Sequence, residues 1–479
     1  MKMVVGPLSR VDGDLEVTLE VRDGVVSEAS VTVPLYRGFE QILQGRHPAD
    51  AMVVSPRICG ACSLSHSVAA ATALAEMGGA DAPPNGRLAA NLLLASEIVA
   101  DHLSHFYLSF MPDFAAPAYA GRPWHRGIAE RFAAIVGTAG QAADRARARL
   151  LHIVGLLGGK WPHGLAIQPG GTTKAADAGD RIRLFSILAD CRRFLEDDVF
   201  GVELEQIVEL DSGAALSAWQ GFGRGARGDL GHFLAIADDL ALEQLGKGPD
   251  RLMSFGALPN NDGWLFARGL WMGKSAPLDI DEVAEDVVSS WMAGRAESPW
   301  RGTTRPDADK ARAYSWCKAP RLAGAAVEVG PLARQLIDSH PLVIDLFRSS
   351  GSNVRNRIVA RMIETARLIP AMERWVNELR PREPFHRLTD RPLAGRAVGV
   401  AEGARGSLGH WLTVTDGRIA NYQVISAGTW NLSPRDAAGT PGPLELALTG
   451  TPVGSGEEGP LAIQHIIRSF APCAFCATH

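Results

Sequence analysis

Two short stretches near opposite ends of the chain decide how it must fold: Arg57-Ile-Cys-Gly-Ala-Cys-Ser-Leu-Ser-His66 and Pro472-Cys-Ala-Phe-Cys-Ala-Thr-His479. Each contains a Cys-x-x-Cys pair, Cys59/Cys62 in the first and Cys473/Cys476 in the second. Both sulfurs of such a turn can point toward one centre. Together the pairs make a set of four thiolates, which suits zinc, iron–sulfur or another metal that prefers soft ligands.

Two other interpretations of these cysteines are open. A structural zinc site is the commonest use of four cysteines, but zinc ribbons usually close over about 15–20 residues, whereas about 410 residues separate these pairs. Two separate redox dithiols would need a thioredoxin-like βαβ setting, which the sequence does not show. His66 and His479 follow the pairs closely and offer donors to metal-bound thiolates. The spacing favours a metal buried between the two ends of the chain, without naming the metal.

The composition excludes several classes of protein. The chain has 479 residues, 48 basic and 53 acidic, a net charge of −5 and 46% apolar residues. This content supports a large core and argues against disorder, and the charge balance argues against a nucleic-acid or anionic-membrane binder. No run approaches the roughly 20 apolar residues that cross a bilayer, and the start of the chain turns polar before a signal-peptide core could form. We expect a soluble, cytoplasmic protein, and six cysteines are too few for a disulfide scaffold.

The pattern of apolar residues predicts an α+β fold. Alternation on both sides of Asp23-Gly24 and of Asp416-Gly417 indicates two hairpins. Helical spacing predicts helices over residues 67–76, 88–110, 128–157, 180–194 and 353–379, and the Gly- and Pro-rich region 221–306 is expected to hold loops with short strands. We expect residues 1–479 to form a single large domain, with a core bundle of long helices and strand-rich regions at both ends.

With these motifs in hand, the chain resembles the large subunit of [NiFe] hydrogenases. Beyond the two cysteine stretches, the resemblance rests on eight further segments. These are Arg10-Val-Asp-Gly-Asp-Leu15, Tyr36-Arg-Gly-Phe-Glu40, His102-Leu-Ser-His-Phe-Tyr107, Gln168-Pro-Gly-Gly171, Tyr314-Ser-Trp-Cys-Lys-Ala-Pro-Arg321, Gly330-Pro-Leu-Ala-Arg334, Glu402-Gly-Ala-Arg-Gly-Ser-Leu-Gly-His410 and Thr429-Trp-Asn-Leu-Ser-Pro-Arg435. Any one segment alone is weak, whereas the combination is specific.

The resemblance implies heterolytic activation of H2 at a nickel–iron centre. All four paired cysteines would bind nickel, and Cys62 and Cys476 would bridge to an iron that carries carbon monoxide and cyanide. Splitting H2 needs an electron-rich metal with an open position and a nearby base. His66 would hydrogen-bond a bridging thiolate, while His102 and His105 are expected to be core histidines.

The resemblance also implies roles for residues around the metals. Arg405 would lie over the centre as a base or electrostatic partner, and Asp113 would hold that arginine. Asp12 would accept the proton. A separate list of ligands is implied for a magnesium-like ion: Glu40, His479 and the carbonyl of Val424.

Several positions depart from the family pattern. Asp12 replaces the usual glutamate and shortens its reach by one methylene, to which proton transfer is sensitive. Ala471 replaces an acid that would contact Arg405, and Ala427-Gly428 replaces a Pro followed by a hydroxyl residue that commonly binds a cyanide ligand. We therefore expect metal assembly to survive better than fast turnover.

The branch of the family is inferred from the residues of the motifs and from the length of the sequence. Catalytic members usually carry a C-terminal extension, whereas this sequence stops at His479, as in the regulatory, hydrogen-sensing branch. His66 argues against that branch, because its members often have glutamine at this position. We expect a sensor, with a low-turnover uptake enzyme and a non-catalytic four-cysteine metal protein as alternatives. The expected partners are an iron–sulfur small subunit, maturation proteins and, for a sensor, a histidine kinase.

Overall fold

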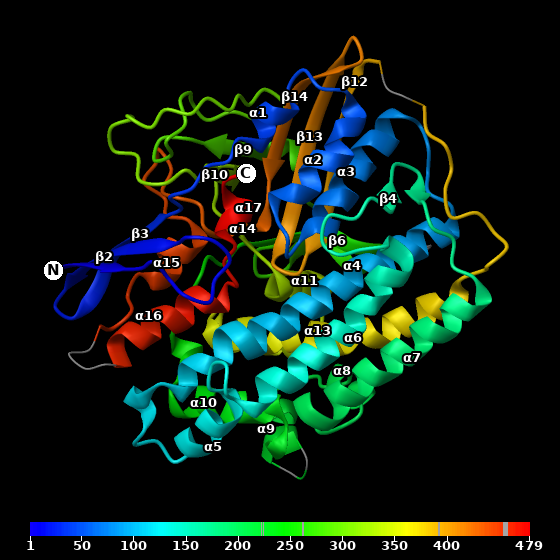
Figure 1. Cartoon of the computed structure of the whole chain (residues 1–479). Coiled ribbons are helices and arrows are strands. Elements are labelled where there is room, and N and C mark those ends of the chain that lie inside the picture. Colours follow the sequence, from blue (N-terminus) through cyan, green and yellow to red (C-terminus); the bar gives the residue numbers. More distant parts are fainter. Residues whose placement is uncertain (222, 224, 261–262, 391–392, 454–457) are drawn as a thin grey trace.

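The computed structural model describes every residue except 222, 224, 261–262, 391–392 and 454–457. Its long helices gather in one half of the molecule, and its strands lie in the other half and at one side (Figure 1). The helices are α1 (Phe39–Leu43), α2 (Ala51–Val54), α3 (Ser63–Met77), α4 (Pro84–Ser104), α5 (His125–Phe132), α6 (Thr138–Gly158), α7 (Ala178–Phe194), α8 (Leu204–Val208), α9 (Gly213–Gly221), α10 (Asp229–Asp239), α11 (Pro331–Ile337), α12 (Pro341–Ser350), α13 (Val354–Glu378), α14 (Ala427–Asn431), α15 (Pro443–Leu448), α16 (Glu458–Ser469) and α17 (Ala474–Ala477).

The strands form small sheets, so the predicted α+β class is confirmed. They are β1 (Lys2–Val5), β2 (Glu16–Arg22), β3 (Val25–Thr32), β4 (Ile167–Gln168), β5 (Gly171–Thr172), β6 (Leu252–Asn260), β7 (Gly263–Trp271), β8 (Ser275–Ala276), β9 (Val283–Asp286), β10 (Ala319–Leu322), β11 (Glu328–Val329), β12 (Gly395–Gly403), β13 (Gly406–Thr415) and β14 (Arg418–Ile425). The sheet orders are β1-β2-β3, β12-β13-β14, β11-β6-β7-β8, β10-β9 and β4-β5.

The long helices pack as the apolar spacing predicts, with one difference. Helix α4 packs against α6 and α13, and α6 packs against α7. The predicted helix over residues 128–157 is wrong in one respect, because α5 ends at Phe132 and α6 begins at Thr138. Ile135 has a φ of 71°, and a side chain at Gly137 would lie 2.6 Å from the Arg131 carbonyl. This turn admits no helical continuation.

Both predicted hairpins are confirmed. Asp23 and Gly24 have φ values of 52° and 75°, and Asp416 and Gly417 have 50° and 67°. Positive φ at both central residues is the geometry that matches the twist of paired strands. A third antiparallel strand, β1 or β12, completes each sheet.

The expectation of loops with short strands over residues 221–306 is wrong in its first half. The nine-residue strands β6 and β7 pair with each other, and α10 precedes them. Every residue from Leu252 to Leu258 is buried, so β6 lacks the alternation that marks a half-exposed strand. Gly256, with a φ of 85°, lies inside the strand instead of ending it.

The fold brings the two ends of the chain together. Asp12 forms an isolated parallel bridge with Cys473, and α17 packs against α14, which follows β14. On the other side α3 packs against β12 so closely that a side chain at Gly399 would lie 1.8 Å from the Ala69 carbonyl oxygen. No helix in the described part of the chain has both the length and the apolar character to cross a bilayer.

Candidate metal centre

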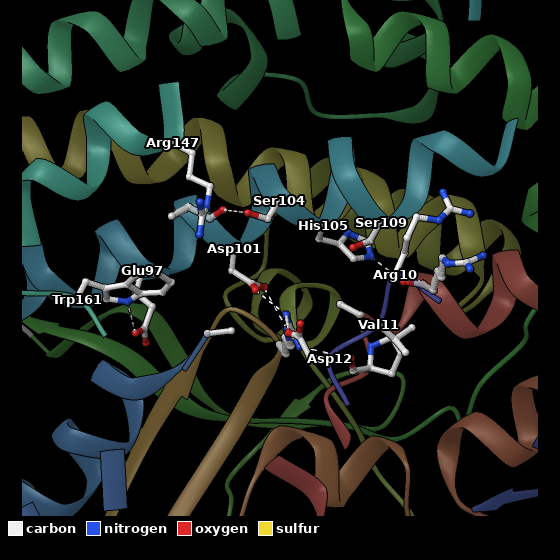
Figure 2. Close-up of a pocket in the computed structure, with 16 residues that line it drawn as sticks. Arg10, Val11, Asp12, Glu97, Asp101, Ser104, His105, Ser109, Arg147 and Trp161 are labelled. Atoms are coloured by element: carbon white, nitrogen blue, oxygen red, sulfur yellow. Dashed lines mark hydrogen bonds and ion pairs between the residues drawn. The ribbon is translucent and has the colours of Figure 1, made fainter. Parts of the chain in front are cut away.

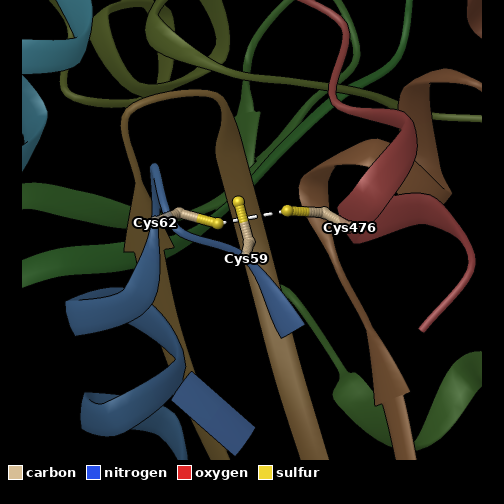
Figure 3. A group of neighbouring side chains, drawn as sticks. All are labelled: Cys59, Cys62 and Cys476. Atoms are coloured by element: carbon tan, nitrogen blue, oxygen red, sulfur yellow. Dashed lines mark hydrogen bonds between the residues drawn. The ribbon is translucent and has the colours of Figure 1, made fainter. Parts of the chain in front are cut away.

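The four paired cysteines meet in the interior. The sulfurs of Cys59 and Cys473 lie 3.6 Å apart, those of Cys62 and Cys476 3.1 Å, and those of Cys473 and Cys476 3.1 Å. Figure 3 shows Cys59 and Cys62 from the first pair facing Cys476 from α17. The sulfurs of these three residues all lie within 4.8 Å of one another. The predicted convergence of the two pairs is therefore seen in the structure, in a geometry that one metal could share.

Contacts among the four thiols shift their pKa values. Hydrogen bonds with Cys473, Cys476 and Cys62 lower the pKa of Cys59 well below its ordinary value. The bond with Cys473 raises the pKa of Cys476 well above it. These contacts favour ionisation at Cys59, and the thiolate is the form that coordinates metals.

Backbone packing places both pairs. The Ala474 N–H donates to the Asp12 carbonyl at 2.8 Å, which fixes the start of α17. A side chain at Gly428 would lie 2.5 Å from the Cys473 carbonyl oxygen, so the departure at this position has a steric reason. Arg37 donates to the carbonyls of Ile58 and Phe475 and so connects the two cysteine loops.

Glu97 of α4 anchors the first pair, and no local pattern of residues predicts this role. Its carboxylate accepts the N–H groups of Leu64 and Ser65, at 2.9 and 3.1 Å, which open helix α3 just after Cys62. Trp161 donates to the same carboxylate at 3.1 Å (Figure 2). Cys62 itself provides no side-chain cap, so Glu97 does this from another helix. Burial raises the pKa of Glu97 to about 7 despite these donors.

Arg405 is held by Asp101 and Asp12. Its guanidinium donates to both oxygens of Asp101, at 2.7 and 3.2 Å, forms an ion pair with Asp12, and lies 3.4 Å from the Pro472 carbonyl. Burial alone would raise the pKa of Asp101, but the positive charge of Arg405 lowers this pKa below its ordinary value. These residues line a pocket of about 140 Å³ together with Ala471 (Figure 2).

The predicted role of Asp113 is wrong. Its carboxylate contacts Arg10, Arg468 and His465, whereas Asp101 holds Arg405. Asp113 is fully buried in that second cluster, which ties the residues just before Asp12 to helix α16. It is a structural anchor for the loop that carries Asp12.

His66 is buried between the first cysteine pair and β13. Its Nδ1 lies 3.0 Å from His410 Nε2, and His410 in turn lies 2.7 Å from the Tyr422 hydroxyl. Its Nε2 is buried with no hydrogen-bond partner among the described residues, and burial lowers its pKa to about 4. His102 and His105 lie in the core, bonded to Glu364 and to a backbone carbonyl.

A second polar cluster lies around Glu40. His479 Nε2 is 3.2 Å from Glu40, the Val424 N–H donates to the same carboxylate at 2.8 Å, and Thr304 also donates to it. Lys318, for which the sequence predicts no role, lies 3.3 Å from Glu40. The three predicted ligand residues are therefore neighbours, with Val424 contacting Glu40 through its N–H.

The comparisons with known proteins agree with this geometry. A profile of the family described as nickel-dependent hydrogenase matches residues 37–120 and 142–479. The chain belongs to this family. The hydrogenase is 30% identical over 524 aligned positions to the large subunit of the periplasmic [NiFeSe] hydrogenase of Desulfomicrobium baculatum, covering all of this chain and 95% of the relative.

Two further relatives extend the agreement. The Hydrogenase-2 large chain of Escherichia coli K12 is 28% identical over 568 positions, covering all of this chain and 97% of its own length. The reduced [NiFeSe] hydrogenase structure from Desulfovibrio vulgaris Hildenborough superposes with a TM-score of 0.84 at 30% identity, and each chain is fully covered. The predicted large-subunit fold and the assignment as an oxidoreductase acting on H2 are confirmed.

Proposed function

We propose that this hydrogenase large subunit activates H2 heterolytically at a nickel–iron centre held by Cys59, Cys62, Cys473 and Cys476. The observation that carries the proposal is the convergence of four sulfurs from both ends of the chain beside a largely buried, charged arginine. Thiolates are the ligands that soft metals prefer, so the donor set fits nickel.

The chemistry divides between the metals and this chain. When bound, the nickel–iron centre, with carbon monoxide and cyanide on the iron, would supply a polarising, electron-rich position for H2. Cys62 and Cys476, whose sulfurs are 3.1 Å apart, are close enough to share a second metal. Arg405 stays protonated at any physiological pH, so we assign to it electrostatic stabilisation, with Asp101 fixing its direction.

Asp12 is the carboxylate that we propose takes the proton away from the centre. It is ion-paired with Arg405, and its side chain is 40% exposed toward the pocket. A group that contacts both the buried arginine and solvent can receive a proton on one side and release it on the other.

The cluster of Glu40, His479 and Val424 is proposed to hold a magnesium-like ion. A buried carboxylate and an imidazole within 3.2 Å of each other offer two ligand groups that converge, and hard divalent cations prefer oxygen ligands. The ion would tie the loop after the second cysteine pair to α1.

Electrons need a partner chain. The two remaining cysteines, Cys191 and Cys317, are buried and free, and two thiols are too few to hold an iron–sulfur cluster. We therefore propose that an iron–sulfur small subunit carries the electrons. The names of the relatives, which are large subunits, support this. Maturation proteins would install the iron ligands. A cytoplasmic location remains a prediction.

A hydrogen-sensing role, with a histidine kinase downstream, is the finer proposal, and a low-turnover uptake enzyme is its alternative. The supporting observation is the pair of departures from the family pattern beside Arg405: Ala471 contributes no carboxylate, and Asp12 stands in place of a longer glutamate. A protein that detects H2 needs binding and activation, but little turnover.

Infrared spectra of the heterodimer, expressed with its maturation proteins, test the proposal. Carbonyl and cyanide bands that shift between hydrogen and air are expected. Absence of these bands, with zinc bound to the four thiols, would contradict it and leave a structural metal protein. If the bands are present, turnover with an artificial electron acceptor distinguishes a sensor from an uptake enzyme.

A further inference from the structure

A polar pocket of about 450 Å³ opens beside the Glu40 cluster. Glu285, Lys318 and Gln423 contribute to its lining, together with Thr303 and Arg305 at exposed positions. Glu285 and Lys318 also line a small inner cavity of about 10 Å³ that Glu40 and His479 face. These two side chains therefore separate the open pocket from the proposed cation site.

Glu285 has an unused ligand atom. Its side chain is only 4% exposed, and its Oε2 lies 3.0 Å from Lys318 Nζ. Its Oε1 is buried and has no hydrogen-bond partner in the described part of the chain. A buried carboxylate oxygen is unfavourable unless a donor or a cation meets it.

One ammonium group serves two buried carboxylates. Lys318 lies 3.3 Å from Glu40 and 3.0 Å from Glu285, and also contacts Gln423 at 2.9 Å. Glu40 has a further partner in His479, at 3.2 Å, whereas Glu285 Oε1 has none among the described residues. A divalent cation could bind at this oxygen, and Lys318 lies between it and Glu40.

The sizes of the outer pocket and the inner cavity determine where an entering ion must lose its water. The inner cavity has room for about one water molecule, whereas Mg²⁺ gives up its water reluctantly and usually keeps several. A hydrated ion therefore fits the outer pocket but not the inner cavity. It must exchange water for protein ligands at the wall between the two.

We propose that the outer pocket is the entry for the divalent cation, with Glu285 Oε1 as its first protein ligand and Lys318 as the group that moves aside. The inference rests on the proposed cation site of Glu40 and His479. It assigns to Glu285 a role in loading the ion as well as in supporting it once bound.

Uptake of Mn²⁺ by the chelator-treated heterodimer tests this, because the EPR signal of free Mn²⁺ disappears on binding. We expect Glu285→Gln, which keeps the shape and removes the charge, to slow loading and to weaken binding about 10–100-fold, as loss of groups that support metal ligands does. Thr303→Trp, at the exposed rim, should slow loading without changing the final amount bound, and Thr303→Ser should change neither.

The outcomes separate the two proposals. Unchanged loading rates in both Glu285→Gln and Thr303→Trp would overturn the entry route. Glu40→Gln should abolish retention of the ion; if it still binds Mn²⁺ like the unmodified protein, the cation site itself is wrong. Loss of binding in Glu40→Gln with normal loading in the other variants would retain the site and reject the route.

Discussion

The replacement Asp101→Asn tests which carboxylate controls Arg405. The amide has the same shape but cannot carry the charge that meets the guanidinium through two hydrogen bonds of 2.7 and 3.2 Å. Removing one partner of a buried ion pair costs about 3–5 kcal/mol. Unfolding entropy scales with length, so for 479 residues each kcal/mol lowers Tm by about 1 °C, and we expect a fall of about 3–5 °C.

Asp113→Asn is the matched control. It breaks the buried contacts with Arg10 and Arg468, so its Tm should fall by a similar amount. Only Asp101→Asn loosens Arg405 beside the cysteines, because it leaves the ion pair with Asp12 as its remaining contact with a carboxylate among the described residues. A displacement of about 1 Å near reacting atoms can reduce turnover about 100-fold. Calorimetry gives Tm, and H2-dependent reduction of an artificial acceptor by the heterodimer gives turnover. Equal activity losses in the two variants, or a loss confined to Asp113→Asn, would refute the assignment.

Three further predictions concern the surroundings of the centre. Because Glu97 has a pKa of about 7 in the folded chain, against 4.5 for an ordinary glutamate, the folded state holds a proton that the unfolded state releases. Stability should therefore fall by about 1.4 kcal/mol per pH unit between these values as the pH rises, and Tm measured against pH in Glu97→Gln should lack this fall. Ala471 has a φ of 50°, which Asp tolerates better than Ala, so Ala471→Asp should raise Tm by about 1 °C through a new contact with Arg405, and Ala471→Asn by less. Cys476→Ser should abolish bound nickel measured by mass spectrometry, while Cys317→Ser, buried outside the group of four, should keep it.

Each has an outcome that contradicts it. An identical pH profile in the Glu97→Gln protein would mean that this carboxylate is ionised throughout. A lower Tm in Ala471→Asp than in Ala471→Asn would mean that the added charge finds no partner. Full nickel content in Cys476→Ser would remove this thiol from the ligand set.

The features that could be predicted from the sequence are those that depend on a few neighbouring residues. The cysteine pairs could be matched because their spacing is a property of a few residues, and the hairpins because Asp-Gly specifies the turn. Strand β6 escaped prediction since a strand buried on both faces has no period of two.

The role of Asp113 was taken from the resemblance, and the spacing of residues could not correct it. Asp101 and Asp113 lie on one continuous helical segment, but residues His105–Phe110 form a π-helical stretch between them. Such a stretch changes the number of residues per turn, so the face that each carboxylate presents cannot be counted from the spacing. Glu97 and Lys318 were missed because their partners come from distant parts of the chain.

The position of the second cysteine pair also governs how the molecule can come apart. Cys59 and Cys473 are 414 residues apart in sequence, and closing a loop of that length costs about 5 kcal/mol of chain entropy. Yet opening it requires only that the segment 472–479 swing away from α14 and Asp12. Local openings need much less free energy than global unfolding. The opening of segment 472–479, and not the unfolding of the helical core, would therefore set the lifetime of a bound metal. Nickel release should therefore be fast compared with the loss of helical structure, and hydrogen exchange at Ala474 and Ala477 should report it.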